Sequence, residues 1–274
     1  MKASKTTFIV PAVIGLLITS CGRSFDNKAV EFIGETKAAA FTLAGSADVF
    51  QRDNDLVYYD SVNMLMPSVI HNHDISPLRD SIFTLAFDTV GVKTHDIIDA
   101  YLSAAAARTG FEAVPTEDTD SVRLINCDGY EFVTGTAASL TPDYLGYCVT
   151  TMYYIPGAAH GMTTRYYVNY DIVSGKVFTA TDIFTPEGLK ELPGVIRKRA
   201  QDMASFTGPV TITDMPSRNN FYISASGEIL FVYQPYEAAS YSQGFISVPF
   251  DPYELADLMT AYGLKYFNLD DLDG

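Results

Sequence analysis

The run from Tyr153 to Phe184 constrains the fold most, because it places a strand, a loop, a second strand, a tight turn and the approach to a helix in succession. Residues 144–154 are rich in β-branched and aromatic side chains, and residues 163–172 alternate tyrosines with polar side chains, which is typical of half-buried strands. Ser174-Gly175-Lys176 predicts a tight turn between strands. Thr185-Pro186 predicts the cap and the first residue of a helix.

The loop between the two strands reads Pro-Gly-Ala-Ala-His-Gly over residues 156–161. Its glycines can adopt positive φ, and its small residues allow another backbone or a ligand to come close to His160. The imidazole could transfer protons, bind a metal, or tie the loop to a neighbouring strand through hydrogen bonds. We favour the hydrogen-bonding role, because no second histidine lies nearby at ligand spacing and no nucleophile motif is present. The binding residues predicted for this loop are Pro156, Gly157, His160 and Gly161.

Proline and glycine punctuate the predicted elements elsewhere. A strand is expected over residues 57–66, ended by Pro67, and an exposed loop is expected over residues 111–121. Pro193-Gly194 should interrupt the helix that begins after Thr185. Residues 251–254, Asp-Pro-Tyr-Glu, form a capping box that opens the last helix.

Strand pairs joined by hairpins, with helices inserted in blocks, favour an α+β fold. We predict antiparallel sheets with packed helices, organised as two intimately associated halves. These halves are residues 29–115 and 116–264, and an acidic tail follows at residues 265–274.

The N-terminus has the pattern of a lipoprotein signal peptide over residues 1–20. Two lysines precede an apolar run too short to span a membrane as a helix, and small residues precede Cys21. A membrane helix is the alternative, which Pro11 and the polar residues after the run disfavour. We therefore expect a lipid on Cys21, a tether over residues 21–28, and an extracytoplasmic, membrane-anchored (cell-envelope or periplasmic) protein.

The charge balance limits the partners. Removing the signal takes the basic count from 18 to 16 against 33 acidic residues, so the net charge falls to about −17. Nucleic acid and anionic lipid headgroups would be repelled, whereas a cationic protein would be attracted. The acidity also serves solubility.

Two further cysteines, Cys127 and Cys148, remain after Cys21. In an oxidising compartment a disulfide between them would stabilise the fold by about 3 kcal/mol. Two buried thiols are the alternative, because sequence spacing does not determine whether the two β-carbons meet.

Several motifs resemble the RsiV-like extracellular domain family. The first set runs through residues 159–161 (Ala-His-Gly), 169–171 (Asn-Tyr-Asp), 174–176 (Ser-Gly-Lys) and 181–184 (Thr-Asp-Ile-Phe). The second set is residues 231–239 with Gly244. Ala158 and Ser240 depart from the family pattern, which has a glycine and a proline at these positions.

This resemblance implies a cell-envelope sensing or binding domain. The family's named example recognises lysozyme through its ectodomain and holds a sigma factor on the cytoplasmic side. Only residues 1–7 precede the apolar run, so no sigma-factor role is expected here. The expected partner is a cationic protein such as lysozyme, or peptidoglycan, with Tyr236 and Glu237 among the binding residues. The family is also similar to accessory regions of peptidoglycan deacetylases, whose metal-binding motifs are absent from this sequence.

A cell-wall hydrolase is the alternative function, with His160 acting together with Glu237 or Asp171. Glycoside hydrolysis needs two carboxylates across a cleft, and Asp171, Asp182 and Glu237 all lie in the matched motifs. Turn, cap and loop hydrogen bonds are the competing roles for these side chains. His71 and His73 could share one face of an extended segment and bind a metal together with a carboxylate. Their sequence favours a solvated turn instead. No metal or other cofactor is predicted.

Overall fold

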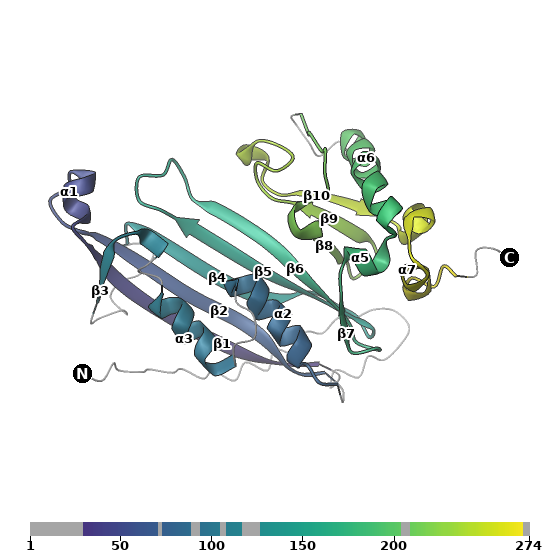
Figure 1. Cartoon of the computed structure of the whole chain (residues 1–274), viewed down its shortest axis with the longest axis horizontal. Coiled ribbons are helices and arrows are strands. Elements are labelled where there is room, and N and C mark those ends of the chain that lie inside the picture. The colour runs from purple at the N-terminus through teal and green to yellow at the C-terminus, as the bar shows by residue number, and fades with distance from the viewer. Residues whose placement is uncertain are drawn as a thin grey trace. The chain divides into compact units, whose positions relative to one another are not determined.

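The computed structural model describes residues 30–70, 73–88, 94–104, 108–116, 127–203 and 209–270. The predicted signal peptide, Cys21 and the tether lie outside these residues. Figure 1 shows a mixture of sheets and packed helices, which confirms the predicted α+β class. Seven strands form one sheet in the order β3-β1-β2-β4-β5-β6-β7, and three form a second in the order β10-β9-β8. The strands of the larger sheet are β1 (Val30–Ala44), β2 (Leu56–Ile70), β3 (Glu112–Pro115), β4 (Gly129–Leu140), β5 (Tyr144–Tyr154), β6 (Met162–Asp171) and β7 (Lys176–Phe178).

The chain forms two compact units. The first comprises residues 1–136 and 149–163, and the second comprises residues 137–148 and 164–274. The units therefore divide within strands β4, β5 and β6. The predicted halves, 29–115 and 116–264, follow the order of the chain and make a different partition.

In the first unit, β1 and β2 pair antiparallel from Val30 opposite Ile70 to Leu43 opposite Leu56. The sequence predicts that Pro67 ends this strand, but β2 continues through it to Ile70. The register shifts beside Pro67, where Glu31 faces Val69 and Phe32 faces Pro67. A bulge of this kind tolerates proline, because the ladder of hydrogen bonds is already interrupted there.

Strands β2 and β4 run parallel, so the sheet is mixed and not wholly antiparallel as predicted. A parallel pair needs a long crossover, and the chain between these strands contains α2 (Ser76–Phe87), α3 (Thr94–Ser103) and β3. The pairing of β3 with β1 also corrects the first part of the loop predicted over residues 111–121, because residues 112–115 form an edge strand. Residues 117–121 lie outside the described residues.

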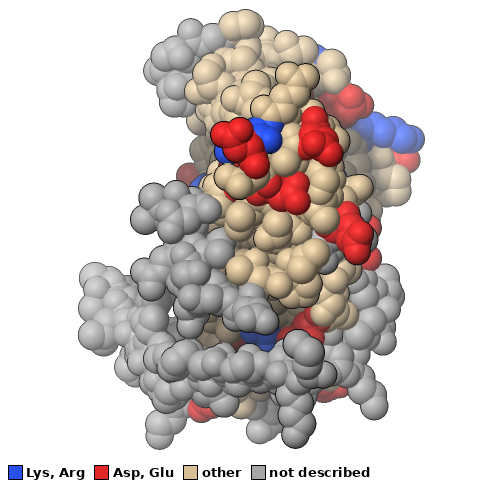
Figure 2. All heavy atoms as spheres, turned by 90° about the vertical axis from the view of Figure 1, so that its left-hand side faces the viewer, with Lys and Arg blue, Asp and Glu red and all other residues tan. Residues whose placement is uncertain are grey.

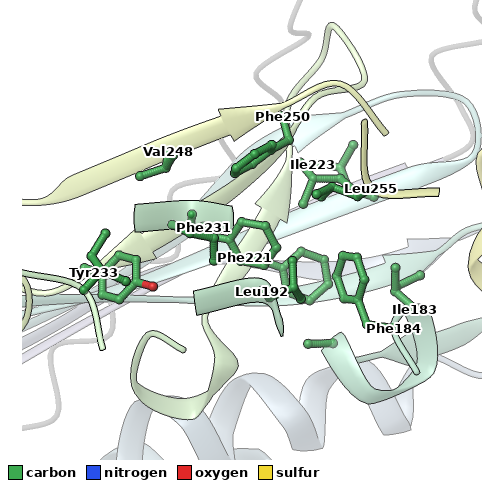
Figure 3. Close-up of a cluster of buried hydrophobic side chains, with 14 of the residues drawn as sticks. Ile183, Phe184, Leu192, Phe221, Ile223, Phe231, Tyr233, Val248, Phe250 and Leu255 are labelled. Carbon is green, nitrogen blue, oxygen red and sulfur yellow. The ribbon is translucent and has the colours of Figure 1, made fainter. Parts of the chain in front are cut away.

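The second unit packs helices against the small sheet of β8 (Phe221–Ile223), β9 (Ile229–Tyr233) and β10 (Ile246–Phe250). Figure 3 shows its core, in which the Phe231 ring lies 5.9 Å from Phe184 and 6.0 Å from Phe250 between centroids. The surrounding helices are α5 (Ala180–Ile183), α6 (Pro186–Asp202), the 3-10 helix η3 (Pro252–Leu258) and α7 (Ala261–Tyr266). The predicted capping box of Asp251 and Glu254 is present, although it opens a 3-10 helix. Helix α7 overlaps the predicted start of the acidic tail at residue 265.

Helix α6 is continuous for 17 residues, although the sequence predicts an interruption at Pro193. Proline has no N–H to donate to the Leu189 carbonyl, which costs about 3 kcal/mol in a helix interior. Leu192 and Ile196 are both fully buried on the core side of the helix. Burial of two such side chains contributes about 1.5–3 kcal/mol each, which is enough to offset the proline.

Candidate binding site

The turn from Gln234 to Glu237 holds a tyrosine in a strained conformation. The Glu237 N–H donates to the Gln234 carbonyl at 3.0 Å, and Tyr236 has a φ of 70°. Proline at the second position and positive φ at the third identify a type II turn, in which glycine is preferred at the third position. A residue with a side chain costs about 1–2 kcal/mol there.

A second strained turn covers Pro216 to Asn219. The Asn219 N–H donates to the Pro216 carbonyl at 2.8 Å, and Arg218 and Asn219 have φ values of 60° and 51°. The Arg218 guanidinium lies 5.1 Å from the centroid of the Tyr166 ring, within the range of a cation–π contact. This contact and the turn together fix where the cation is held.

One carboxylate joins the two turns. Glu237 Oε1 accepts from the N–H and hydroxyl of Ser217, and Glu237 Oε2 accepts from the Gln234 N–H at 2.6 Å. Hydrogen bonds to a charged acceptor are stronger than neutral ones, so this side chain can hold the strained backbone on both sides. We call the residues 216–219 and 234–237 the clamped turns.

The clamped turns present Tyr236 to solvent. Its side chain is 58 % exposed, and its ring lies 5.5 Å from that of Tyr241 in the 3-10 helix η2 (Tyr241–Gln243). Tyrosine offers a broad apolar surface with a polar end and loses little conformational entropy on binding. Such a surface suits recognition of a protein or of a sugar ring.

Two side-chain amides attach β6 to this region within the same unit. Gln234 accepts from the Arg165 N–H at 2.8 Å and donates to the Arg165 carbonyl at 2.7 Å. Asn220 accepts from the Tyr167 N–H and donates to the carbonyls of Arg165 and Val232. Both amides are buried, so the backbone around the clamped turns is held rigidly.

The predicted loop over residues 156–161 belongs to the first unit. His160 Nδ1 lies 2.8 Å from the Gly161 carbonyl, so the half-buried ring contacts the main chain of its own loop. Gly157 has a φ of 88°, and a β-carbon there would lie 3.0 Å from the Phe50 ring. A β-carbon on Gly161 would lie 3.1 Å from the Tyr153 carbonyl. Pro156 packs close to Gly129, so the loop is shaped by contacts at several of its predicted residues.

Asp171 and Asp182 hold local structure. Asp171 Oδ1 accepts from the N–H groups of Val173 and Ser174 at 2.9 and 3.0 Å, and Oδ2 accepts from the Ser174 hydroxyl at 2.5 Å. The Asp182 carboxylate accepts from the Thr179 N–H at 2.7 Å and completes a capping box at α5. The Asp171 carboxylate is thus bound within its own turn, the Glu237 carboxylate is bound to the two clamped turns, and His160 belongs to the other unit. These contacts give no support to the alternative function as a cell-wall hydrolase.

A partly buried ionic cluster in the first unit was not anticipated from the sequence. Arg108 donates to Asp60 at 2.7 Å and to Glu131 at 3.0 Å, and its guanidinium lies 4.0 Å from the Tyr101 ring centroid. Asp60 is fully buried, and its Oδ1 has no hydrogen-bond partner among the described residues. Burial raises the pKa of Asp60 to about 7; Arg108 opposes this shift and Glu131 adds to it. The burial of Asp60 could have been predicted, because Asp60 alternates along the strand in step with the apolar residues Tyr58 and Val62 and so shares their face.

Cys127 and Cys148 form no disulfide, and they belong to different compact units. His71 lies outside the described residues. Within the described ranges, no group of three or more His, Cys, Asp or Glu side chains is arranged to hold a metal ion. None of the described helices has the length and apolar character needed to cross a membrane.

Known proteins share sequence or structural similarity with this chain. Residues 181–254 match the family described as "Protein of unknown function (DUF3298)", and these residues include both clamped turns. A crystal structure of a DUF3298 family member from Bacteroides fragilis is similar, with a TM-score of 0.65 and 16% identity over 86% of this chain and 96% of that one. A DUF3298 family protein from Pseudomonas aeruginosa PAO1 gives a TM-score of 0.49 and 14% identity, over 85% of this chain and 96% of that one. No curated protein matches this chain.

Proposed function

We propose that this protein is a lipoprotein of the cell envelope, anchored through a lipid on Cys21, and that its extracytoplasmic part binds a protein or a cell-wall glycan without catalysing a reaction. The clamped turns, with Tyr236 at their surface, are the proposed binding face. The RsiV-like resemblance of residues 231–239 supports the same region.

The strained conformation of Tyr236 carries this proposal. An exposed side chain in the left-handed region costs about 1–2 kcal/mol relative to glycine, and an exposed ring returns little of that cost through burial. Strain of this kind at a rigidly supported surface position favours a functional role. Recognition by an aromatic side chain needs no acid or base, which fits the structural contacts of Glu237.

The acidic surface supports a cationic partner. Figure 2 shows several groups of acidic side chains, with Lys and Arg among them, on the described part of one face, and the predicted mature chain carries about −17 net charge. A cationic protein would be attracted towards such a surface at low ionic strength. Lysozyme is the concrete protein to test, because the resemblance implies it, and soluble peptidoglycan fragments are the glycan to test.

The test measures binding of the full mature chain to lysozyme and to peptidoglycan fragments by calorimetry in low salt. We expect binding of one of them at micromolar concentration, and Tyr236→Ala should weaken it about tenfold or more, as for an aromatic hot spot. Tyr253→Ala is the matched control, because Tyr253 is similarly exposed, at 64 %, but lies in η3. Absence of binding to both ligands, or equal weakening by the two substitutions, would overturn the proposal.

A further inference from the structure

A hollow of about 610 Å³ lies in the second unit, between α6 and the segment from Thr213 to Asn219. Helix α6 contributes Leu189, Lys190 and Pro193, which come from the part of the helix around its proline. The volume is within the range of about 300–1,000 Å³ that is usual for small-molecule sites.

The lining combines apolar walls with charge. Leu189, Pro193, Met215 and Pro216 supply the apolar surface, and Lys190 and Arg218 supply two cations. Asp214 is the acidic residue of the lining, and its carboxylate accepts from the Thr213 hydroxyl at 2.9 Å. The hollow therefore carries a positive balance in a chain that has 33 acidic and 18 basic residues.

Two features of the backbone favour a ligand with both a carboxylate and an N–H group. Arg218 is held by its left-handed backbone and by the Tyr166 ring, so the position of its guanidinium is restricted before any ligand binds. On the α6 side, where Leu189 and Pro193 line the hollow, Pro193 cannot donate to the Leu189 carbonyl, so this acceptor lacks its usual helical donor. A carboxylate suits the two cations, and an amide N–H suits the carbonyl.

We infer that this hollow binds a short peptide through its C-terminal carboxylate. Lys190 and Arg218 hold the carboxylate, the Leu189 carbonyl accepts from a peptide N–H, and the apolar walls contact small side chains. The hollow shares Pro216 to Asn219 with the clamped turns but is not lined by Tyr236. Because Tyr236 takes no part in it, peptide binding is tested independently of binding to lysozyme or glycan.

Calorimetric titration of the mature protein with trialanine and with trialanine amide tests the inference. We expect the acid to bind at least about tenfold more tightly than the amide, because hydrogen bonds to a charged acceptor are stronger than neutral ones. Lys190→Gln and Arg218→Gln should each weaken binding of the acid by about the same factor. Both residues are exposed, so neither substitution should prevent folding.

Lys198→Gln is the matched control, because Lys198 is an exposed lysine of the same helix that does not line the hollow. It should leave binding unchanged. Equal affinity for the acid and the amide, equal affinity for acetate, or no binding at millimolar peptide would each overturn the inference. Equal weakening by Lys190→Gln and Lys198→Gln would also overturn it, since it would indicate attraction by general charge.

Discussion

The carboxylate of Glu237 accepts a hydrogen bond from the main-chain N–H of Ser217, which precedes it by 20 residues. Its other oxygen accepts from the N–H of Gln234 at 2.6 Å. A single side chain therefore connects two turns in which Arg218, Asn219 and Tyr236 have positive φ. The strained backbone conformation of the two turns should therefore be maintained by the hydrogen bonds to this carboxylate.

Glu237→Gln should lower the free energy of unfolding by about 1–3 kcal/mol. Glutamine retains one oxygen and replaces the other with an N–H₂ group, which would face a main-chain or hydroxyl donor without accepting from it. Urea unfolding of the mature protein measures the loss. Glu191→Gln, at an exposed position of α6, is the control and should change stability by less than about 0.5 kcal/mol. A Glu237→Gln variant as stable as its parent would show that the carboxylate does not support the turns.

Tyr236→Gly should be more stable than Tyr236→Ala by about 1 kcal/mol, because glycine adopts positive φ without strain. Both substitutions remove the ring, so the comparison isolates the backbone conformation. The same pair of substitutions at Tyr253 provides the control. Tyr253 lies in a 3-10 helix, where alanine should be the more stable of the two. If alanine is also the more stable residue at 236, the turn is not strained and the argument for the binding face weakens.

Local signals in the sequence were sufficient to predict several caps and turns of the second unit. The cap of α6 by Thr185, the capping box of Asp251 and Glu254, and the turn role of Asp171 all involve groups within three residues of each other. Hydrogen bonds of this range follow from residue type and spacing alone. The contact of Glu237 with Ser217 could not be predicted in this way, because it depends on how β8 and β9 bring distant turns together.

Long-range packing also explains the errors at the two prolines. Pro67 is accommodated by a bulge whose position depends on the register with β1, and Pro193 is accommodated because its helix buries Leu192 and Ile196. A proline signal is local and does not report these compensations. The burial of Asp60, in contrast, could be predicted locally, because Asp60 lies at one of the alternating apolar positions of β2.

Gly188→Ala should destabilise the second unit by about 1–3 kcal/mol, which is usual for overpacking. A β-carbon on Gly188 would lie 2.3 Å from the Leu258 carbonyl oxygen, so α6 and η3 approach too closely for any side chain. Gly194→Ala is the matched control in the same helix, because a β-carbon there meets nothing within 4 Å. This control should stabilise the protein slightly, since alanine favours helix by up to about 1 kcal/mol. Thermal unfolding of the two variants measures the difference, and equal shifts would contradict the close approach.

Arg108→Gln should destabilise the protein more at pH 8 than at pH 5. The pKa of Asp60 is raised to about 7 in the folded state, above its unfolded value of about 3.9, so ionisation of Asp60 costs stability as the pH rises through this interval. Arg108 offsets that cost for Asp60 and for Glu131 beside it, with the Tyr101 ring against the guanidinium. Without the guanidinium, the free energy of unfolding should fall by about 2 kcal/mol at pH 8. This figure is already reduced for solvent screening, because Arg108 is 33% exposed. At pH 5, where Asp60 is mostly protonated, the free energy of unfolding should fall by under about 1 kcal/mol.

Arg52→Gln is the control. It removes a more exposed ion pair with Asp128 and should give a small loss of stability that changes little between the two pH values. Urea unfolding at both pH values tests this, and a loss at pH 5 as large as that at pH 8 would show that Arg108 acts through packing and not through its charge.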